Sequence, residues 1–210
     1  GNLISLCGSR RKESEIMTNT SPLNFVHKVG KFGDNEKKNE NNLLKIAEVN
    51  GLVIFQITQY KNSIFDVSKI ILDGLTFPSS CKSNSNSNTR ILWIGPNNWL
   101  VFSSVLDLLE KEKNQFNEAE FAITDISHSR TIIELEGNLV NEVLKKGCPL
   151  DINSLKDGDC ANSVYNGINI TIDFISESPN KVRILGLRSY SESLHHSVTD
   201  ACLEFGYDAI

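Results

Sequence analysis

Apolar and polar positions alternate along much of the chain and divide it into short strands joined by polar segments. The runs 43–49 and 51–60 meet at Asn50-Gly51, a dipeptide typical of a tight turn, so the two runs are predicted to pair as a hairpin. Alternation or β-branched content predicts the remaining strands at 90–95, 98–104, 121–127, 130–137, 164–175 and 181–189. The pattern is that of a strand-rich chain.

Four segments carry apolar residues at helical spacing. In 62–74 the apolar positions recur every three or four residues, with Asn62 or Ser63 available as the N-cap and Gly74 as the C-cap, so a helix is predicted there. The other predicted helices cover 104–113, 138–147 and 190–206.

Polar stretches indicate where the folded body begins and where its surface is interrupted. Beyond Met17 the chain is polar and charged as far as Leu43, which predicts a flexible N-terminal arm over residues 1–42. Met17 is the only methionine, and we expect translation to begin there, which leaves residues 1–16 outside the fold. Residues 77–90 form a low-complexity polar segment, predicted to be a surface loop without a packed element.

The predicted elements repeat within the folded part, residues 43–210. Its halves, about 43–127 and 128–210, each follow the order strand, helix, long connection, two strands, helix. Two such β-α-β-β-α (ferredoxin-like) units can join their antiparallel sheets into one body with helices outside. The predicted fold class is therefore α+β.

Composition limits the function classes. The 210 residues are 40% hydrophobic, enough to bury a core, and the net charge of −5 gives no basic stripe for nucleic acid. The longest nearly apolar stretch, 90–102, is interrupted at 95–98 and falls short of the ~20 residues that a membrane span needs. Five cysteines without a C-x-x-C pair argue against a zinc knuckle or a disulfide framework and favour the reducing cytoplasm.

One cluster could carry acid–base chemistry. Asp125 and His128 lie three residues apart at the end of a predicted strand, and Arg130 begins the next strand. A catalytic acid–imidazole pair would need a substrate or nucleophile within hydrogen-bond reach in a pocket. The favoured interpretation is a structural turn in which Asp125, Ser127 and Ser129 bond backbone amides.

Cysteine and histidine residues elsewhere favour structural roles. Cys148 follows a predicted helix end at Gly147, whereas a reactive thiolate is favoured at a helix N-terminus or beside a cation, so a buried inert thiol is predicted. His195 and His196 are adjacent in a helix and point about 100° apart, so they cannot bind one metal together, and surface or boundary positions are expected.

Two further motifs could form an anion site or a stacking platform, but each has a simpler structural explanation. Arg188 and Ser189 precede a predicted helix and could hold an anion, but no glycine-rich phosphate loop accompanies them. Helix capping by Ser189 or Ser191 explains the serines equally well. Trp93 and Trp99 flank a turn, where core packing is favoured over a stacking platform. No catalytic, cofactor-binding or metal-binding residue is predicted.

Six segments in order form a more specific signature than any single motif. They are "RILWIGPNNWLVF" (90–102), "TDISHSRTIIELEG" (124–137), "KGCPLDI" (146–152), "DCA" (159–161), "LRSYSESL" (187–194) and "DACLEFG" (200–206). The set resembles the gamma subunit family of heterotetrameric sarcosine oxidase over roughly residues 43–207. The chain departs from that family at Ser129, where glycine is expected, which indicates a turn that does not need a positive φ angle.

The resemblance implies both a fold and a role. The fold would be similar to the folate-binding domain of aminomethyltransferases. The complex would demethylate sarcosine to glycine, reduce oxygen to hydrogen peroxide and form 5,10-methylenetetrahydrofolate. FAD, FMN, NAD and tetrahydrofolate would bind to the alpha and beta subunits and zinc to the delta subunit, with no cofactor in the gamma subunit. A cytoplasmic, non-catalytic accessory subunit that acts through its interfaces is thus expected.

Two alternatives remain open from the sequence. The chain could be a free-standing folate-binding or one-carbon transfer protein on the same fold, with Asp125 as its acid and a pocket near Trp93. It could also be the gamma subunit of a related complex that acts on another N-methylated amino acid such as N-methylglutamate, with an electron acceptor other than oxygen.

Overall fold

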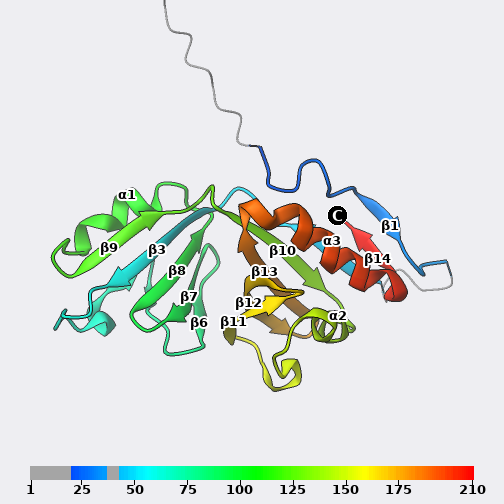
Figure 1. Ribbon diagram of the computed structural model, residues 1–210. Helices are drawn as coiled ribbons and strands as arrows, with labels where there is room; N and C mark the ends of the chain where they lie inside the picture. Colours follow the sequence, from blue (N-terminus) through cyan, green and yellow to red (C-terminus); the bar gives the residue numbers. More distant parts are fainter. Residues whose placement is uncertain (1–19, 37–42) are drawn as a thin grey trace, which may run out of the picture.

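Two β-sheets lie next to each other in the computed structural model, which describes residues 20–36 and 43–210 (Figure 1). The strands are β1 Gly30–Phe32, β2 Leu44–Glu48, β3 Val53–Gln59, β4 Ile71–Leu72, β5 Leu75–Thr76, β6 Ser83–Ser85, β7 Thr89–Gly95, β8 Asn98–Ser103, β9 Phe121–Asp125, β10 Arg130–Glu136, β11 Cys160–Tyr165, β12 Ile168–Glu177, β13 Asn180–Leu187 and β14 Tyr207–Ala209. The α-helices are α1 Leu108–Glu112, α2 Val140–Gly147 and α3 Ser191–Cys202. None of the helices in the described ranges is both long and apolar enough to cross a membrane.

The strand orders define the two sheets. The larger sheet has seven strands in the order β1-β14-β2-β10-β13-β12-β11, and the smaller has five in the order β6-β7-β8-β3-β9. Neighbouring strands are antiparallel except β14 and β2, which run parallel. The α+β fold class is confirmed by this arrangement, but the two β-α-β-β-α halves are not, because the first half lacks its expected first helix.

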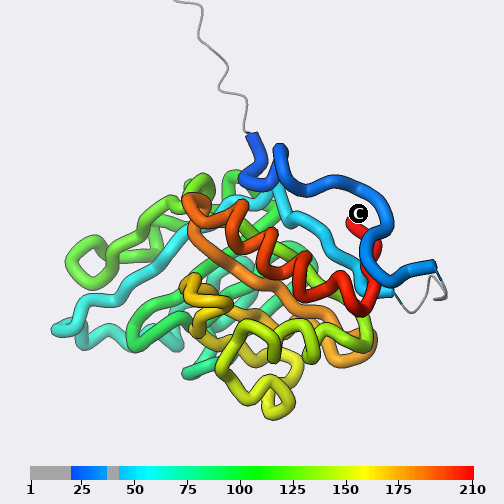
Figure 2. The backbone as a smooth tube through the Cα atoms, turned by 45° about the vertical axis from the view of Figure 1, so that its right-hand side comes forward, coloured from blue at the N-terminus to red at the C-terminus, as the bar shows by residue number. Residues whose placement is uncertain are grey.

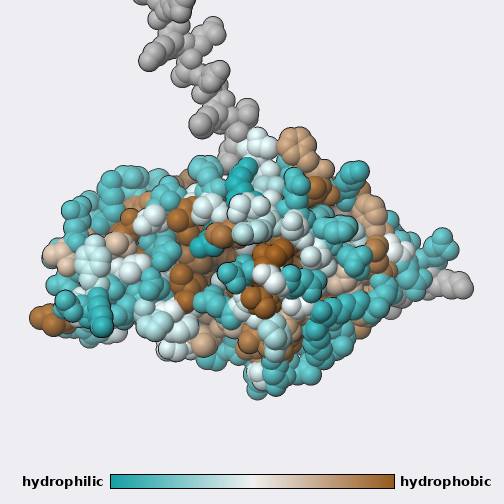
Figure 3. All heavy atoms as spheres, in the orientation of Figure 1, coloured by the Kyte–Doolittle hydropathy of each residue, from teal (hydrophilic) through white to brown (hydrophobic). Residues whose placement is uncertain are grey.

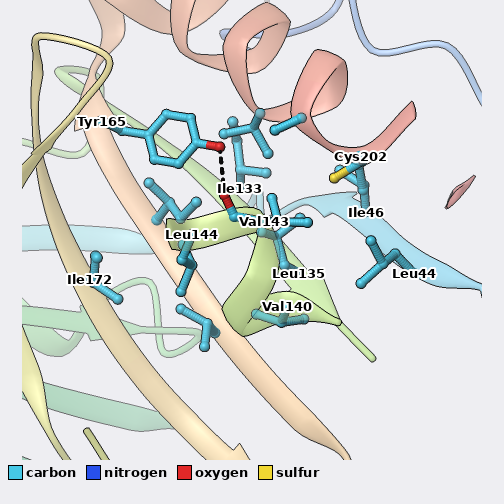
Figure 4. Close-up of a cluster of buried hydrophobic side chains, with 14 of the residues drawn as sticks. Leu44, Ile46, Ile133, Leu135, Val140, Val143, Leu144, Tyr165, Ile172 and Cys202 are labelled. Atoms are coloured by element: carbon cyan, nitrogen blue, oxygen red, sulfur yellow. Dashed lines mark hydrogen bonds between the residues drawn. The ribbon is translucent and has the colours of Figure 1, made fainter. Parts of the chain in front are cut away.

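Three hydrophobic clusters follow the alternation of the strands. The largest packs α2 and α3 on one face of the seven-stranded sheet, and Figure 4 shows its centre around Leu135, Val143 and Tyr165. A second cluster packs α1 on the five-stranded sheet. The third joins the sheets themselves, with residues such as Leu100 and Phe102 on one side and Leu185 on the other. The helices therefore cover the sheet faces turned away from the sheet junction.

A buried ion pair crosses the same junction. Arg90 on β7 donates from Nε and Nη2 to Asp173 on β12, each at 2.7 Å, and the two side chains are 11% and 2% exposed. The Arg90 guanidinium also donates to Ser83 Oγ and to the carbonyl of Phe174. Burial raises the pKa of Asp173, and the Arg90 guanidinium opposes that shift.

The predicted hairpin at Asn50-Gly51 is wrong. β2 belongs to the seven-stranded sheet and β3 to the five-stranded one, so this turn passes the chain from one sheet to the other. The same dipeptide type does make a hairpin at Asn166-Gly167, where φ is 47° and 83° and β11 pairs with β12. A turn dipeptide thus predicts a local turn of the chain. It does not predict whether the two flanking strands belong to the same sheet.

The predicted helix at 62–74 is also wrong. Asp66 caps only a single 3₁₀ turn, Val67–Lys69. The following residues alternate with the period of a strand, since Ile70 is 3% exposed, Ile71 57% and Leu72 0%. β4 then pairs with β5 across a tight turn in which both central residues have positive φ.

The predicted unpacked loop at 77–90 contains strand β6, which is hydrogen-bonded along the edge of β7. Its polar side chains serve the fold: Asn84 and Asn86 donate to the carbonyls of Thr76 and Asp73, at 2.8 and 2.7 Å. Low-complexity polar sequence is therefore compatible with an edge strand whose side chains bind neighbouring backbone.

The expected flexible arm, residues 1–42, is described only over 20–36, and there it packs on the body. Leu23 is fully buried, and its backbone N–H donates to Glu48 at 3.0 Å. β1 adds to the edge of the seven-stranded sheet beside β14. Figure 2 shows this segment in blue, passing over α3 and close to the C-terminus. The predicted start at Met17 lies outside the described residues.

The other predicted elements are found at nearly the predicted places. β7 to β10, β13 and α2 lie within two residues of their predicted bounds, whereas α3 ends four residues before its predicted end. The predicted range 164–175 holds parts of two strands, β11 and β12, and β11 begins four residues before that range. α1 is a shorter helix inside 104–113, followed by a 3₁₀ turn. The long regular segments were predictable because their apolar period is unbroken.

Candidate functional site

The segment between β9 and β10 carries the sequence-predicted acid and imidazole, and it forms a tight turn. Asp125 Oδ1 accepts from the backbone N–H of Ser127 at 2.9 Å and lies 2.7 Å from the Ser127 hydroxyl oxygen. These two hydrogen bonds, with a smaller contribution from nearby His128, lower the pKa of Asp125. The carboxylate is thereby stabilised in its ionised form, which suits a structural turn better than a proton donor.

The two serines fix this turn to both sheets. Ser127 Oγ accepts from the N–H of Ile54 on β3 at 2.9 Å, and Ser129 Oγ donates to the carbonyl of Ile126 at 2.9 Å. The backbone N–H of Arg188, just after β13, donates to the carbonyl of Ser129 at 2.9 Å. The predicted structural turn is therefore present, although Ser129 donates to a carbonyl and does not accept from an amide.

A cavity of about 370 Å³ opens beside this turn, at the junction of the two sheets. His128 and Arg130, from one sequence cluster, and Arg188, from another motif, all line it. In Figure 3, brown patches lie near the middle of a mostly hydrophilic face, over the region where the sheets of Figure 1 meet. Within residues 20–36 and 43–210, this cavity brings together more of the residues that the sequence analysis considered as candidates than the other hollows do.

The described cysteines are free thiols, and three of the four are buried. Cys148 sits at the C-terminal end of α2, and its Sγ donates to Ser163 Oγ at 3.3 Å, in agreement with the predicted buried position. Burial raises the pKa of both Cys160 and Cys202 to about 12, so they stay protonated at neutral pH. Cys7 lies outside the described residues.

The histidine pair on α3 differs from expectation. His196 is exposed, but His195 is only 7% exposed and meets His27 from the N-terminal segment, with Nε2 and Nδ1 3.1 Å apart. Burial first, and then the neighbouring His27, lowers the pKa of His195 to about 4. His27 was missed by sequence analysis because it lies in the segment predicted to be a flexible arm.

The beginning of α3 is not capped as predicted. Neither Ser189 nor Ser191 makes a side-chain capping hydrogen bond, and Ser191 Oγ donates instead to the carbonyl of Pro22 at 3.1 Å. Arg188 donates to the carbonyl of Thr20. Both side chains thus hold the N-terminal segment against the body.

The tryptophans flanking the turn after β7 are packing residues, as favoured. Trp99 is 5% exposed, packs edge-on against Phe77 with ring centroids 5.0 Å apart, and donates from Nε1 to the carbonyl of Pro78. Trp93 lies opposite Trp99 in the β7–β8 register and is half-buried. Within residues 20–36 and 43–210, no three His, Cys, Asp or Glu side chains gather as a metal site would require.

Comparison with known proteins identifies two curated relatives of the chain. No family model matches the chain. The chain is 28% identical over 120 residues to the sarcosine oxidase subunit gamma of Corynebacterium sp. (strain U-96), covering 57% of this chain. It is 25% identical over 138 residues to the same subunit from strain P-1, covering 65% of this chain and 68% of that protein. The aligned part spans only 58% of the length of the U-96 relative.

Solved structures extend the likeness to the whole fold. A chain of the heterotetrameric sarcosine oxidase from Corynebacterium sp. U-96, in complex with pyrrole 2-carboxylate, superposes with a TM-score of 0.72 and 21% identity, covering 89% of this chain and 95% of that one. The aminomethyltransferase T of the glycine cleavage system from Bartonella henselae superposes with a TM-score of 0.56 and 7% identity, covering 81% of this chain and 48% of that one. The fold is thus shared with both, and the resemblance carried by the six segments is confirmed: the chain is a homologue of proteins named sarcosine oxidase subunit gamma.

Proposed function

We propose that this chain is an accessory, non-catalytic gamma subunit of a heterotetrameric sarcosine oxidase. One observation carries the proposal. The relative found by sequence and the solved structure with a similar fold both come from sarcosine oxidase, although the two comparisons cover different fractions of the chain. The complex would convert sarcosine to glycine in the cytoplasm, with hydrogen peroxide and 5,10-methylenetetrahydrofolate as the other products. FAD, FMN, NAD and tetrahydrofolate would bind to alpha and beta subunits, and zinc to a delta subunit.

The environment of the titratable side chains supports a role without bond-breaking chemistry. The carboxylate of Asp125 is held in a turn, His195 is neutral and buried, and the thiol of Cys160 stays protonated. Each of these groups is engaged in holding parts of the fold together. The contribution of this chain would then lie in its contacts with the larger subunits.

Co-purification tests the proposal directly. A tagged form of this chain, co-expressed with the neighbouring genes, is expected to bring down yellow, flavin-containing subunits in a fixed ratio, seen by intact mass and a visible spectrum. The tag alone, expressed with the same genes, is the control. Oxygen consumption by the purified complex with sarcosine, and then with N-methylglutamate, separates a sarcosine oxidase from a related complex with another substrate or acceptor.

A different result would favour the free-standing alternative. If the chain elutes alone, folded and colourless, the accessory-subunit proposal fails, and titration with tetrahydrofolate becomes decisive. Binding that is weakened in Asp125→Asn would then indicate a one-carbon transfer protein on the same fold.

A further inference from the structure

The cavity at the sheet junction is lined by two arginines, apolar side chains and uncharged polar groups, without an acidic residue. Its lining residues are Ser21, Pro22, Val49, Asn50, Gly51, Leu52, Ile54, Ser127, His128, Arg130, Ile132 and Arg188. A second hollow of about 420 Å³ is also lined by Arg130 and has no acidic lining residue either. The chain as a whole carries a net charge of −5, so this local excess of positive charge is not a general property of its surface.

Arg130 differs from the other arginines that the structure describes. Arg90 is paired with Asp173 and Arg183 with Glu134, while Arg188 donates to the carbonyl of Thr20. The Nε of Arg130 is buried and has no hydrogen-bond partner within the described chain. Burial lowers the pKa of Arg130 and no neighbouring carboxylate opposes that shift, yet a guanidinium remains charged at neutral pH. Arg130 as a whole is partly exposed, but a buried guanidinium nitrogen without an acceptor costs stability unless something pairs with it.

The walls of the cavity are held in place. The Ser127 hydroxyl is bonded to β3, the N–H of Val49 donates to the carbonyl of Ile132 at 3.0 Å, and the N–H of Arg188 donates to the carbonyl of Ser129. Arg130 begins β10 and pairs in register with Leu187 on β13. The guanidinium is thus carried by a rigid strand at a fixed edge of the cavity, as a recognition group should be.

We propose that this cavity binds a small organic anion, with the guanidinium of Arg130 as the group that recognises its carboxylate. A guanidinium fork matches a carboxylate in a bidentate geometry, and Arg188 adds a second positive charge to the lining of the cavity. The apolar residues Leu52, Ile54 and Ile132 suit the hydrocarbon part of such a ligand and favour it over inorganic phosphate. This inference does not depend on membership of a complex.

Calorimetric titration of the full chain, in the form in which it purifies, tests the proposal. The probes are benzoate, its neutral analogue benzamide, and inorganic phosphate. Benzoate is expected to bind and benzamide not to bind measurably. Arg130→Gln should weaken benzoate binding about tenfold or more, the size of one lost charge-assisted hydrogen bond. Arg130→Lys keeps the positive charge but loses the two-pronged guanidinium, so its affinity for benzoate should lie between those of the wild type and Arg130→Gln.

The matched control is Lys61→Gln, which removes one positive charge from an exposed site after β3 and should bind benzoate like the wild type. Equal benzoate binding by wild type and Arg130→Gln, or no binding up to about 10 mM, overturns the proposal. Tighter binding of phosphate than of benzoate overturns the choice of an organic anion. If Arg130→Gln binds probes unchanged but loses co-purifying subunits, the partner of Arg130 is a protein carboxylate and the small-ligand proposal fails.

Discussion

The rings of His27 and His195 form a hydrogen-bonded pair that fixes the N-terminal segment on α3. His27 Nε2 lies 3.0 Å from the carbonyl oxygen of Ile210 and must donate to it. In a neutral His27 ring, Nδ1 is then the acceptor, and it accepts from Nε2–H of His195. A proton added to His195 would be partly buried beside a second imidazole, which explains why the neutral form is preferred.

We expect this pair to make stability depend on pH. The pKa of His195 is about 4 in the folded protein, against 6.5 for a histidine in an unstructured peptide, so the unfolded state takes up the proton first as the pH falls. The free energy of unfolding should therefore decrease from about pH 6.5 to about pH 4. Urea unfolding across this range should show a flatter dependence for His195→Gln.

His196→Gln is the control, because His196 lies next in the helix but is exposed, and it should keep the wild-type slope. Identical slopes in wild type and His195→Gln would show that burial of His195 is not the cause. Sequence analysis could place both histidines on the helix. It could not predict that His195 is covered, because the covering residue, His27, is 168 residues away in a polar segment.

α2 packs closely on β11 where Gly147 meets the ring of Tyr165. Tyr165 is fully buried, and its hydroxyl donates to the carbonyl of Val143 at 2.9 Å, which fixes the ring over the end of the helix (Figure 4). A Cβ atom on Gly147 would lie 2.8 Å from the ring atoms Cε1 and Cζ. Gly147 has no left-handed φ angle, so space alone requires glycine here.

Gly147→Ala is expected to lower the free energy of unfolding by about 1–3 kcal/mol, as overpacking does, although alanine favours a helix. Chemical denaturation measures the change. The control Gly95→Ala has no atom within 4 Å of the added Cβ and should stay close to the wild type. A Gly147→Ala protein as stable as the wild type would contradict the fixed position of the tyrosine ring.

Prediction of the elements succeeded where one period covers the whole segment. α2 and the strands around it were predictable, since their apolar positions repeat without interruption and end at turn residues. Segment 62–74 fits a helical spacing and a strand alternation at once. The strand is selected over the helix because the chain turns at Asp73-Gly74 and β4 pairs with β5. The stabilisation that this pairing provides cannot be predicted from the segment itself.

Contacts between the two sheets hold the molecule together, since each sheet is covered by helices on its other face. Apolar residues fill much of the junction, and the Arg90–Asp173 pair is a buried ion pair across it. Sequence analysis predicted the α+β class but placed β2 and β3 in one hairpin, so it missed the transfer of the chain between sheets. Asp173 within an apolar strand was the available signal for a buried ion pair, but its partner on β7 is far away in the sequence.

Removing one member of this pair should be costly. Asp173→Ala leaves the guanidinium of Arg90 buried without its carboxylate, and we expect a loss of about 3–5 kcal/mol in the free energy of unfolding. The double variant Arg90→Met with Asp173→Leu should lose less than Asp173→Ala, because it leaves no charge unpaired. Denaturant titration of both proteins gives the comparison.

The exposed pair Lys111–Asp107 provides the control, and Lys111→Ala should leave the free energy of unfolding close to that of the wild type. A double variant that is less stable than Asp173→Ala would mean that the ion pair itself, and not the avoidance of an unpaired charge, stabilises the junction.

The position of β14 has a consequence for how the chain folds as it is synthesised. β14 lies between β1 and β2, pairing antiparallel with the one and parallel with the other, and neither of those strands contacts the other directly in the sheet order. Residues 30–32 therefore cannot form their strand pairing until residues 207–209 have been synthesised, almost a full chain length later. The five-stranded sheet, complete by residue 125, can assemble during translation, whereas this edge of the seven-stranded sheet closes only after synthesis of β14.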